Sequence, residues 1–210
     1  MNKIQSTSKE LLLVFTRNPE LGKCKTRLAA TVGDQAALDI YTFLLEHTVH
    51  ITMPLPMDIW VCYSEAIAES DLWDANRYHK KRQQGHDLGV RMMHLFQEGF
   101  DAGYKKIGII GSDMFHLDSQ DLNTAFGLLD KHDYVIGPAE DGGYYFLGMN
   151  RFKKEVFQDK DWGQDSVLLD TINDLKNDGY TLLPTRNDVD YYEDIKDIKA
   201  FEPFLKHLKE

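Results

Sequence analysis

The sequence has few cysteines, no excess of positive charge and no long apolar run, and each shortage excludes a class of protein. Its only two cysteines, Cys24 and Cys62, are too few for a disulfide framework and lack metal-site spacing. The formal net charge of -10 disfavours nucleic acid and anionic membrane surfaces as partners, because both attract lysine and arginine. No apolar run reaches membrane length, and the first ten residues lack the apolar core of a signal peptide. We therefore expect a cytoplasmic protein with neither a nucleic-acid nor a membrane partner.

Size and composition favour one globular domain that covers residues 1–210. Hydrophobic residues make up 42% of the sequence and charged residues 28%, a balance that argues against disorder. A chain of this length can bury a sizeable core but is short for two domains. No repeat, low-complexity tract or linker-like boundary interrupts the sequence.

Short apolar runs alternate with segments of helical periodicity along the chain. The apolar runs predict strands over residues 11–15, 59–63, 107–110, 134–136, 144–147 and 181–183. The periodic segments predict helices over residues 34–50, 88–102, 119–131, 166–177 and 195–208, and Asp34 is a candidate cap for the first helix. This alternation predicts an α/β fold, a three-layer α/β/α sandwich with a mostly parallel sheet. Antiparallel pieces near residues 140–150 would make the sheet mixed.

A basic loop follows the first predicted strand. The stretch RNPELGKCKTRL, residues 17–28, concentrates cations in an otherwise acidic protein, and open α/β sheets bind ligands at the carboxyl ends of their strands. Its glycine permits close approach of backbone N–H groups to phosphate, and its cations add charge. The spacing is that of neither a Walker A loop nor a GxGxxG fingerprint, and a solvated basic loop is the alternative. The candidate phosphate-binding residues are Arg17, Gly22, Lys23, Lys25 and Arg27.

Carboxylates follow two other predicted strands. Asp113 ends the stretch Gly111-Ser112-Asp113, where a carboxylate can hold Mg²⁺ or Mn²⁺ while phosphates complete the coordination. The late stretch DVDYYEDI, residues 188–195, offers Asp190 as a second metal ligand. The alternatives are a turn-capping role for Asp113 and helix N-terminal roles for the acidic residues that follow Asp190.

Two further stretches contain glycines beside polar side chains. In GPAEDGGYYFLG, residues 137–148, Gly142 and Gly143 permit a tight turn near a ligand, and Asp141 can serve the metal or the acceptor; a plain hairpin is the alternative. In QQGHDLGVRM, residues 83–92, Gln84 can hydrogen-bond a nucleobase and Gly85 permits close approach. The alternative there is a loop and helix cap, with Asp87 as the capping residue.

Together, these five motifs resemble the bacterial glycosyltransferase-like proteins related to CofC, a family often named for arsenosugar biosynthesis or for radical-SAM genomic neighbours. That family belongs to the nucleotide-diphospho-sugar transferase superfamily, so the resemblance implies a GT-A type of fold. It also implies that Lys25 and Arg27 contact phosphates and that Gln84 lies near the base. Asp113 and Asp190 would be metal ligands, with Asp141 near the substrate. The sequence departs from the family pattern at Phe115, Tyr191 and residues 162–164.

The motifs and the resemblance together predict a Mg²⁺- or Mn²⁺-dependent transferase that uses a nucleotide-activated donor. The leading hypothesis is glycosyl transfer from a nucleotide sugar to a small acceptor. A nucleotidyltransferase that joins a nucleoside triphosphate to a small phosphorylated acid is the first alternative. A non-catalytic nucleotide-binding protein is the second, kept open by Phe115 and Tyr191. The predicted catalytic residues are Asp113, Asp141, Lys25 and Arg27.

Overall fold

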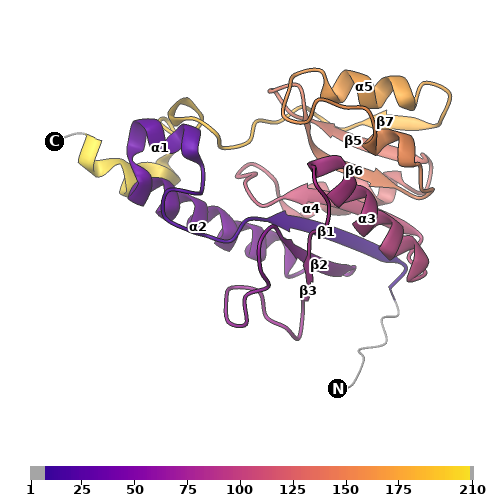
Figure 1. Ribbon diagram of the computed structural model, residues 1–210, viewed down its shortest axis with the longest axis horizontal. Coiled ribbons are helices and arrows are strands. Elements are labelled where there is room, and N and C mark those ends of the chain that lie inside the picture. Colours follow the sequence, from indigo (N-terminus) through magenta and orange to yellow (C-terminus); the bar gives the residue numbers. More distant parts are fainter. Residues whose placement is uncertain (1–7, 209–210) are drawn as a thin grey trace.

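The computed structural model describes residues 8–208 and is built around one seven-stranded sheet in the order β3-β2-β1-β4-β6-β5-β7 (Figure 1). The strands are β1 Glu10–Thr16, β2 Asp58–Tyr63, β3 His79–Arg82, β4 Lys106–Gly111, β5 Tyr134–Pro138, β6 Tyr144–Met149 and β7 Tyr180–Leu182. The β1, β2, β3 and β4 strands pair in parallel, β6 is antiparallel to both of its neighbours, and β7 runs parallel to β5. The sheet is therefore mixed, and β6 supplies its antiparallel part.

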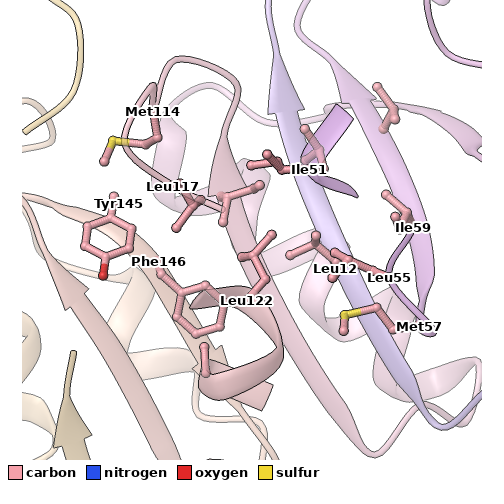
Figure 2. Close-up of a cluster of buried hydrophobic side chains, with 14 of the residues drawn as sticks. Leu12, Ile51, Leu55, Met57, Ile59, Met114, Leu117, Leu122, Tyr145 and Phe146 are labelled. Carbon is pink, nitrogen blue, oxygen red and sulfur yellow. The ribbon is translucent and has the colours of Figure 1, made fainter. Parts of the chain in front are cut away.

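Helices cover both faces of this sheet. Successive side chains of a strand point to opposite faces, so the apolar side chains of the central strands need a helical layer on each side. Leu12 and Val14 of β1 pack with the helices α2 (Asp34–Thr52) and α4 (Ser119–Leu128), in a cluster that Figure 2 shows in part. Leu11 and Leu13 pack on the other face, with α3 (Leu88–Asp101) and neighbours of α5 (Val167–Asp174). This arrangement confirms the predicted three-layer α/β/α sandwich with a mixed, mostly parallel sheet.

A smaller third cluster joins the helices that follow β1 to the last helix of the described chain. It forms between α1 (Thr26–Val32), α2 and the 3₁₀-helix η3 (Lys199–Leu208), which lie together at one end of the molecule (Figure 1). Leu28, Ile40 and Phe201 are fully buried in it. This packing anchors α1, and with it the basic loop that precedes α1.

Several predicted boundaries are corrected by the structure. Residues 26–28, assigned to a loop, begin α1, and Asp34 lies in the first turn of α2 while Gly33 occupies the capping position. The last helix, predicted over residues 195–208, is the 3₁₀-helix η3, inside which Pro203 cannot donate a helical hydrogen bond, and a separate 3₁₀ turn, η2 (Tyr192–Asp194), precedes it. A further 3₁₀ turn, η1 (Lys154–Phe157), precedes α5.

Within residues 8–208, no helix combines the length and the apolar character that spanning a bilayer requires.

Candidate active site

The carboxyl ends of β1 and β4 lie side by side, and a buried hydroxyl network joins them. The Tyr41 hydroxyl of α2 accepts a hydrogen bond from the Arg17 N–H at 2.9 Å, and it lies 3.2 Å from both Thr16 Oγ1 and Ser112 Oγ. Ser112 therefore points into the protein and serves the scaffold. The neighbouring Asp113 points toward the cavities described below.

The late acidic segment is attached to the end of β4 through its backbone. The Val189 N–H donates to the Asp113 carbonyl at 3.3 Å, which places Asp188 and Asp190 beside Asp113. Asp194 holds this segment in shape, because its carboxylate accepts from the backbone N–H groups of Asp190 and Tyr191. The helix N-terminal role suggested as the alternative for the acidic residues after Asp190 describes Asp194, which accepts from the N–H of Tyr191, the residue that caps the short 3₁₀-helix η2.

Three carboxylates gather at this point. Oxygen atoms of Asp113, Asp188 and Asp190 all lie within 4.8 Å of one another. Asp113 and Asp190 are the two predicted metal ligands, and the structure adds Asp188, from the same late motif as Asp190, to the carboxylates beside them. Carboxylate oxygens are the ligands that Mg²⁺ and Mn²⁺ prefer, so this donor set fits such a cation.

Lys25 is the central counter-charge of the cluster. Its Nζ lies 2.7 Å from Asp113 Oδ2 and 2.8 Å from Asp190 Oδ1, and its side chain is only 7% exposed. Arg27, which lies at the surface, places its Nη1 2.9 Å from Asp190 Oδ2. Lys25 occupies the residue before α1 with a left-handed φ of 47°, a conformation that is uncommon for a side chain other than glycine. The basic loop and the carboxylates therefore form one charged site.

The site has three carboxylates and two paired cations, Lys25 and Arg27, and this excess of acidic groups shifts the pKa values of its side chains. Burial opposes the charge of Lys25, but the carboxylates of Asp113 and Asp190 outweigh burial and raise the Lys25 pKa. Burial likewise opposes the charge of Asp190, but Lys25 and Arg27 lower its pKa. Burial, followed by the charges of Asp113 and Asp190, raises the pKa of Asp188 to about 7. A bound divalent cation would supply the missing positive charge.

These opposite shifts predict opposite mutational effects in metal-free protein. As pH rises from 4 to 8, the unfolded chain loses the Asp188 proton before the folded protein does, so Asp188 lowers stability at neutral pH. We expect Asp188→Asn to raise the free energy of unfolding at pH 8 by about 1–2 kcal/mol, after allowing for solvent screening, and to change little at pH 4. Because the pKa of Asp190 is lowered in the folded protein, its charge stabilises the fold at pH values above its ordinary pKa. Asp190→Asn should therefore lower the free energy of unfolding at pH 8.

Urea unfolding of both variants in EDTA, at pH 4 and pH 8, measures these differences. Asp188 and Asp190 lie two residues apart, so each variant is the control for the other. If both variants lose stability at pH 8 by similar amounts, the assignment of excess negative charge to Asp188 is wrong.

Two cavities meet at the carboxylates. A polar cavity of about 610 Å³ extends toward the basic loop, and a mainly apolar cavity of about 230 Å³ extends toward β6 and α5. Both are lined by Phe15, Leu88, Gly111, Asp113 and Asp188. The carboxylate cluster therefore lies where the two cavities join.

The polar cavity contains most of the predicted phosphate-binding residues. Its lining includes the predicted Arg17, Lys23, Lys25 and Arg27, together with Gln83, Arg91 and Ser64. The predicted Gly22, Gln84 and Gly85 line neither cavity among the residues that the structure describes.

Two side chains near Gln84, Gln83 and Arg91, line the polar cavity, which Gln84 itself does not line. Gln83 is buried and donates to the Cys62 carbonyl at 2.8 Å, whereas Gln84 is exposed. Arg91 Nε donates to the Gly85 carbonyl at 3.0 Å, so Gly85 helps to orient Arg91 at the cavity wall. The alternative suggested for this stretch is also confirmed, because the Asp87 side chain accepts from the Val90 N–H and caps α3.

The glycine-rich turn between β5 and β6 is a hairpin, as the alternative for that stretch stated. Asp141 and Gly143 line the apolar cavity, and Asp141 Oδ1 accepts from the Gly143 N–H at 2.9 Å. Gly142 instead contacts the protein itself, because a Cβ there would lie 2.3 Å from the Asp165 carbonyl oxygen. The turn therefore packs against the loop before α5, and the two together wall the apolar cavity.

Two departures from the family pattern lie outside both cavities. The Phe115 ring packs 4.9 Å from that of Phe201, in the cluster that anchors α1. The Tyr191 ring lies 5.7 Å from the Arg27 guanidinium, which it helps to hold beside Asp190. Within the described part of the chain, neither ring lines a cavity. The third departure, Trp162 to Gln164, does line the apolar cavity.

The mixed sheet, its helical layers and the cavities at its carboxyl edge define a class of fold, that of the nucleotide-diphospho-sugar transferases and nucleotidyltransferases. A family model described as "uncharacterized protein conserved in bacteria (DUF2064)" matches residues 48–164, and the chain belongs to this family. No curated protein matches the chain.

Solved structures support the same fold. A protein of Desulfovibrio desulfuricans G20 with the provisional name nucleotide-diphospho-sugar transferase is 30% identical, with a TM-score of 0.84 over 97% of this chain and 96% of that one. A cytidylyltransferase from Leptospira borgpetersenii is 14% identical, with a TM-score of 0.55 over 96% and 94% of the two chains. The CMP:2-keto-3-deoxy-manno-octonic acid synthetase, complexed with CTP, is 10% identical, with a TM-score of 0.55 over 93% and 99%.

Proposed function

We propose that this protein is a transferase that moves a group from a nucleotide-activated donor to a small acceptor. The observation that carries the proposal is the position of the carboxylate cluster, between a polar cavity and an apolar one. A two-substrate reaction needs both substrates to meet at the reacting centre. The junction of the cavities is the point where this protein concentrates its charged groups.

The donor belongs in the polar cavity. Its volume of about 610 Å³ lies within the range of small-molecule sites, and Arg17, Lys23 and Arg91 line it in addition to the paired Lys25 and Arg27. Arginine binds phosphate oxygens in pairs through its planar guanidinium. These side chains would hold the diphosphate of the donor next to the carboxylates.

Asp113, Asp188 and Asp190 would hold Mg²⁺ or Mn²⁺. When bound, such a cation supplies electrostatic stabilisation to the charge that develops on the leaving phosphate. Lys25 and Arg27 then keep the carboxylates together and add positive charge at the same place. The protein's own contribution is a fixed arrangement of charges that needs little reorganisation during the reaction.

Glycosyl transfer is the leading chemistry, in line with the resemblance to glycosyltransferase-like proteins. The acceptor oxygen forms a bond to the anomeric carbon of the sugar, while the bond from that carbon to the diphosphate breaks and its electron pair leaves with the nucleoside diphosphate. The hydroxyl proton passes to a carboxylate. Asp141 is our candidate for that base, because it lines the apolar cavity beside the carboxylate cluster and its Oδ1 is oriented by the Gly143 N–H.

Nucleotidyl transfer is the second candidate, and the number of cations favours it. Five arginine and lysine side chains line the polar cavity, and a triphosphate needs more positive charge than a diphosphate. Its product would be pyrophosphate, released as the acceptor oxygen bonds to the α-phosphorus. Identification of the released phosphate product by ³¹P NMR distinguishes the two chemistries.

The proposal is tested by a thermal-shift panel of nucleoside triphosphates and nucleotide sugars, each with Mg²⁺ or with EDTA. A ligand present at 100 times its Kd should raise the melting temperature of wild type by about 5–10 °C. We expect this shift to require Mg²⁺ and to be lost in Asp113→Asn. Asp121→Asn is the matched control, because Asp121 lies in α4 and pairs with Arg186 outside both cavities. A protein that no nucleotide stabilises is not the transferase proposed here, and one that binds but forms no product is a non-catalytic binding protein.

A further inference from the structure

The apolar cavity has a lining that restricts what can enter it. It measures about 230 Å³, below the range of about 300–1,000 Å³ that is typical of ligand sites, and most of its wall is apolar, so only a small molecule or one part of a larger one fits it. The side chains that form this wall are Phe15, Leu88, Met92, Met114, Tyr144, Tyr145, Trp162 and Val167. Leu88 and Phe15 are shared with the polar cavity, so the two spaces are continuous at the carboxylates.

The charged groups of this cavity are all acidic. Asp113 and Asp188 stand at its inner end, and Asp141 stands at the hairpin turn. Over residues 8–208, no lysine, arginine or histidine lines it. Lys25 and Arg27 line only the polar side and are already paired with carboxylates, and Arg186, which acts on the wall residue Tyr145 from outside the cavity, is paired with Asp121. An anion in the apolar cavity would meet these three acidic side chains and no cation in the cavity wall, because Lys25 and a bound divalent cation would already be engaged with the carboxylates and the donor phosphates.

One neutral polar group in the wall has no strong partner. Among residues 8–208, the hydrogen-bond partner of the Tyr144 hydroxyl is the Met92 sulfur, at 3.9 Å, and a thioether is a weak acceptor. Burial raises the Tyr144 pKa, so the hydroxyl stays protonated and available as a donor at neutral pH. Trp162 adds a flat apolar surface, packed against the start of α3 so closely that a Cβ on Gly89 would lie 2.6 Å from its indole nitrogen.

We propose that the apolar cavity binds the acceptor, and that this acceptor is an uncharged, mainly apolar molecule that carries a hydroxyl group. The proposal rests on the proposed function and narrows its substrate class. The hydroxyl lies among the carboxylates, within reach of Asp141, while the apolar body packs on Trp162 and the neighbouring rings. A phosphorylated acid, the acceptor of the nucleotidyl-transfer alternative, does not suit this cavity because nothing in its wall balances a negative charge.

The test uses two probes with one carbon skeleton, 3-phenylpropan-1-ol and 3-phenylpropanoate, with phosphoenolpyruvate as a polar anion. Binding to wild type is followed through tryptophan fluorescence, and Trp162→Phe identifies the contribution of the cavity, since Trp60 and Trp73 line neither cavity. We expect the alcohol to bind at least about tenfold more tightly than either anion. The alcohol signal should disappear in Trp162→Phe.

A charge-adding variant tests the same inference without removing a wall residue. Gln164 is exposed and lines the cavity, so Gln164→Arg should tighten 3-phenylpropanoate binding several-fold. Gln158→Arg makes the same change at an exposed position away from the cavity and should leave both probes unaffected. The inference is overturned if an anion binds wild type as tightly as the alcohol or more tightly. It is also overturned if the alcohol does not bind, or if Gln164→Arg has no effect on binding.

The same preparations separate this inference from the proposed function. If nucleotides with Mg²⁺ stabilise the protein but the cavity prefers an anion, the function stands and the acceptor class is wrong. If the cavity prefers the alcohol but no nucleotide binds, the cavity is correctly described and the transferase proposal fails.

Discussion

Replacement of Lys25 with methionine is expected to lower the free energy of unfolding by about 2–4 kcal/mol in metal-free protein. Methionine keeps the apolar length of the side chain and removes only the ammonium group. That group lies within 2.8 Å of both Asp113 and Asp190, which are themselves only 32% and 27% exposed. Its loss leaves three neighbouring carboxylates with Arg27 as their remaining direct partner.

Urea unfolding in EDTA measures this loss of stability, and the same experiment in Mg²⁺ provides a second measurement. A divalent cation can compensate the carboxylates that Lys25 no longer neutralises, so Mg²⁺ should restore part of the stability of Lys25→Met by mass action. Lys23→Met is the matched control, because Lys23 is 73% exposed and, over residues 8–208, pairs with Glu20 alone; its effect on stability should be far smaller than that of Lys25→Met. Equal stabilities of the two variants would show that Lys25 does not hold the cluster together.

The second large effect is expected at the hairpin turn, where Gly142→Ala should destabilise the protein by about 3 kcal/mol or more. Gly142 has a φ of 85°, and a Cβ there would lie 2.3 Å from the carbonyl oxygen and 2.5 Å from the Cα of Asp165. Neither backbone atom can rotate away, so the turn and the loop before α5 must separate. The hydrogen bond from the Leu168 N–H to the Gly142 carbonyl, 2.9 Å long, would be strained by the same movement.

Gly103→Ala separates the two causes of this effect. Gly103 has a similar φ of 97°, but a Cβ there meets nothing within 4 Å, so only the backbone strain of about 1 kcal/mol applies. Chemical unfolding of both variants gives the difference directly. Because the Gly142 turn walls the apolar cavity, Gly142→Ala should also weaken binding of 3-phenylpropan-1-ol, whereas Gly103→Ala should not. A Gly142→Ala variant as stable as Gly103→Ala would contradict the close contact.

The fold could be predicted from the sequence where burial on both faces leaves a plain signal. Residues 11–15 and 107–110 are continuous apolar runs because β1 and β4 lie in the middle of the sheet. The β3 strand was missed for the opposite reason. It is the edge strand HKKR, its polar side chains are only partly buried, and its Lys81 packs over the Trp60 ring at 4.3 Å. The α1 helix was missed because its seven residues follow directly on a basic loop and depend on tertiary packing.

The site could be predicted in part because residues at the carboxyl ends of parallel strands must meet. That rule alone is enough to predict that Asp113 and the basic loop lie at the same edge of the sheet. It could not assign Lys25 to the carboxylates, which lie 88 and 165 residues away in the chain. Nor could it choose Gln83 over Gln84, since only the pairing of β3 with β2 turns Gln83 inward. Asp188 and Asp190 carry the same side chain, and their different charge environments exist only in the folded protein.

The central claim is that the carboxylate cluster and the polar cavity form one nucleotide site that depends on a divalent cation. Isothermal titration calorimetry tests it most directly, with the nucleotide that gives the largest thermal shift, on wild type and Asp113→Asn, in Mg²⁺ and in EDTA. We predict that wild type with Mg²⁺ binds at least about tenfold more tightly, by ~1.4 kcal/mol, than the other three combinations. Equal affinity in all four combinations would place the nucleotide away from the carboxylates and contradict this claim.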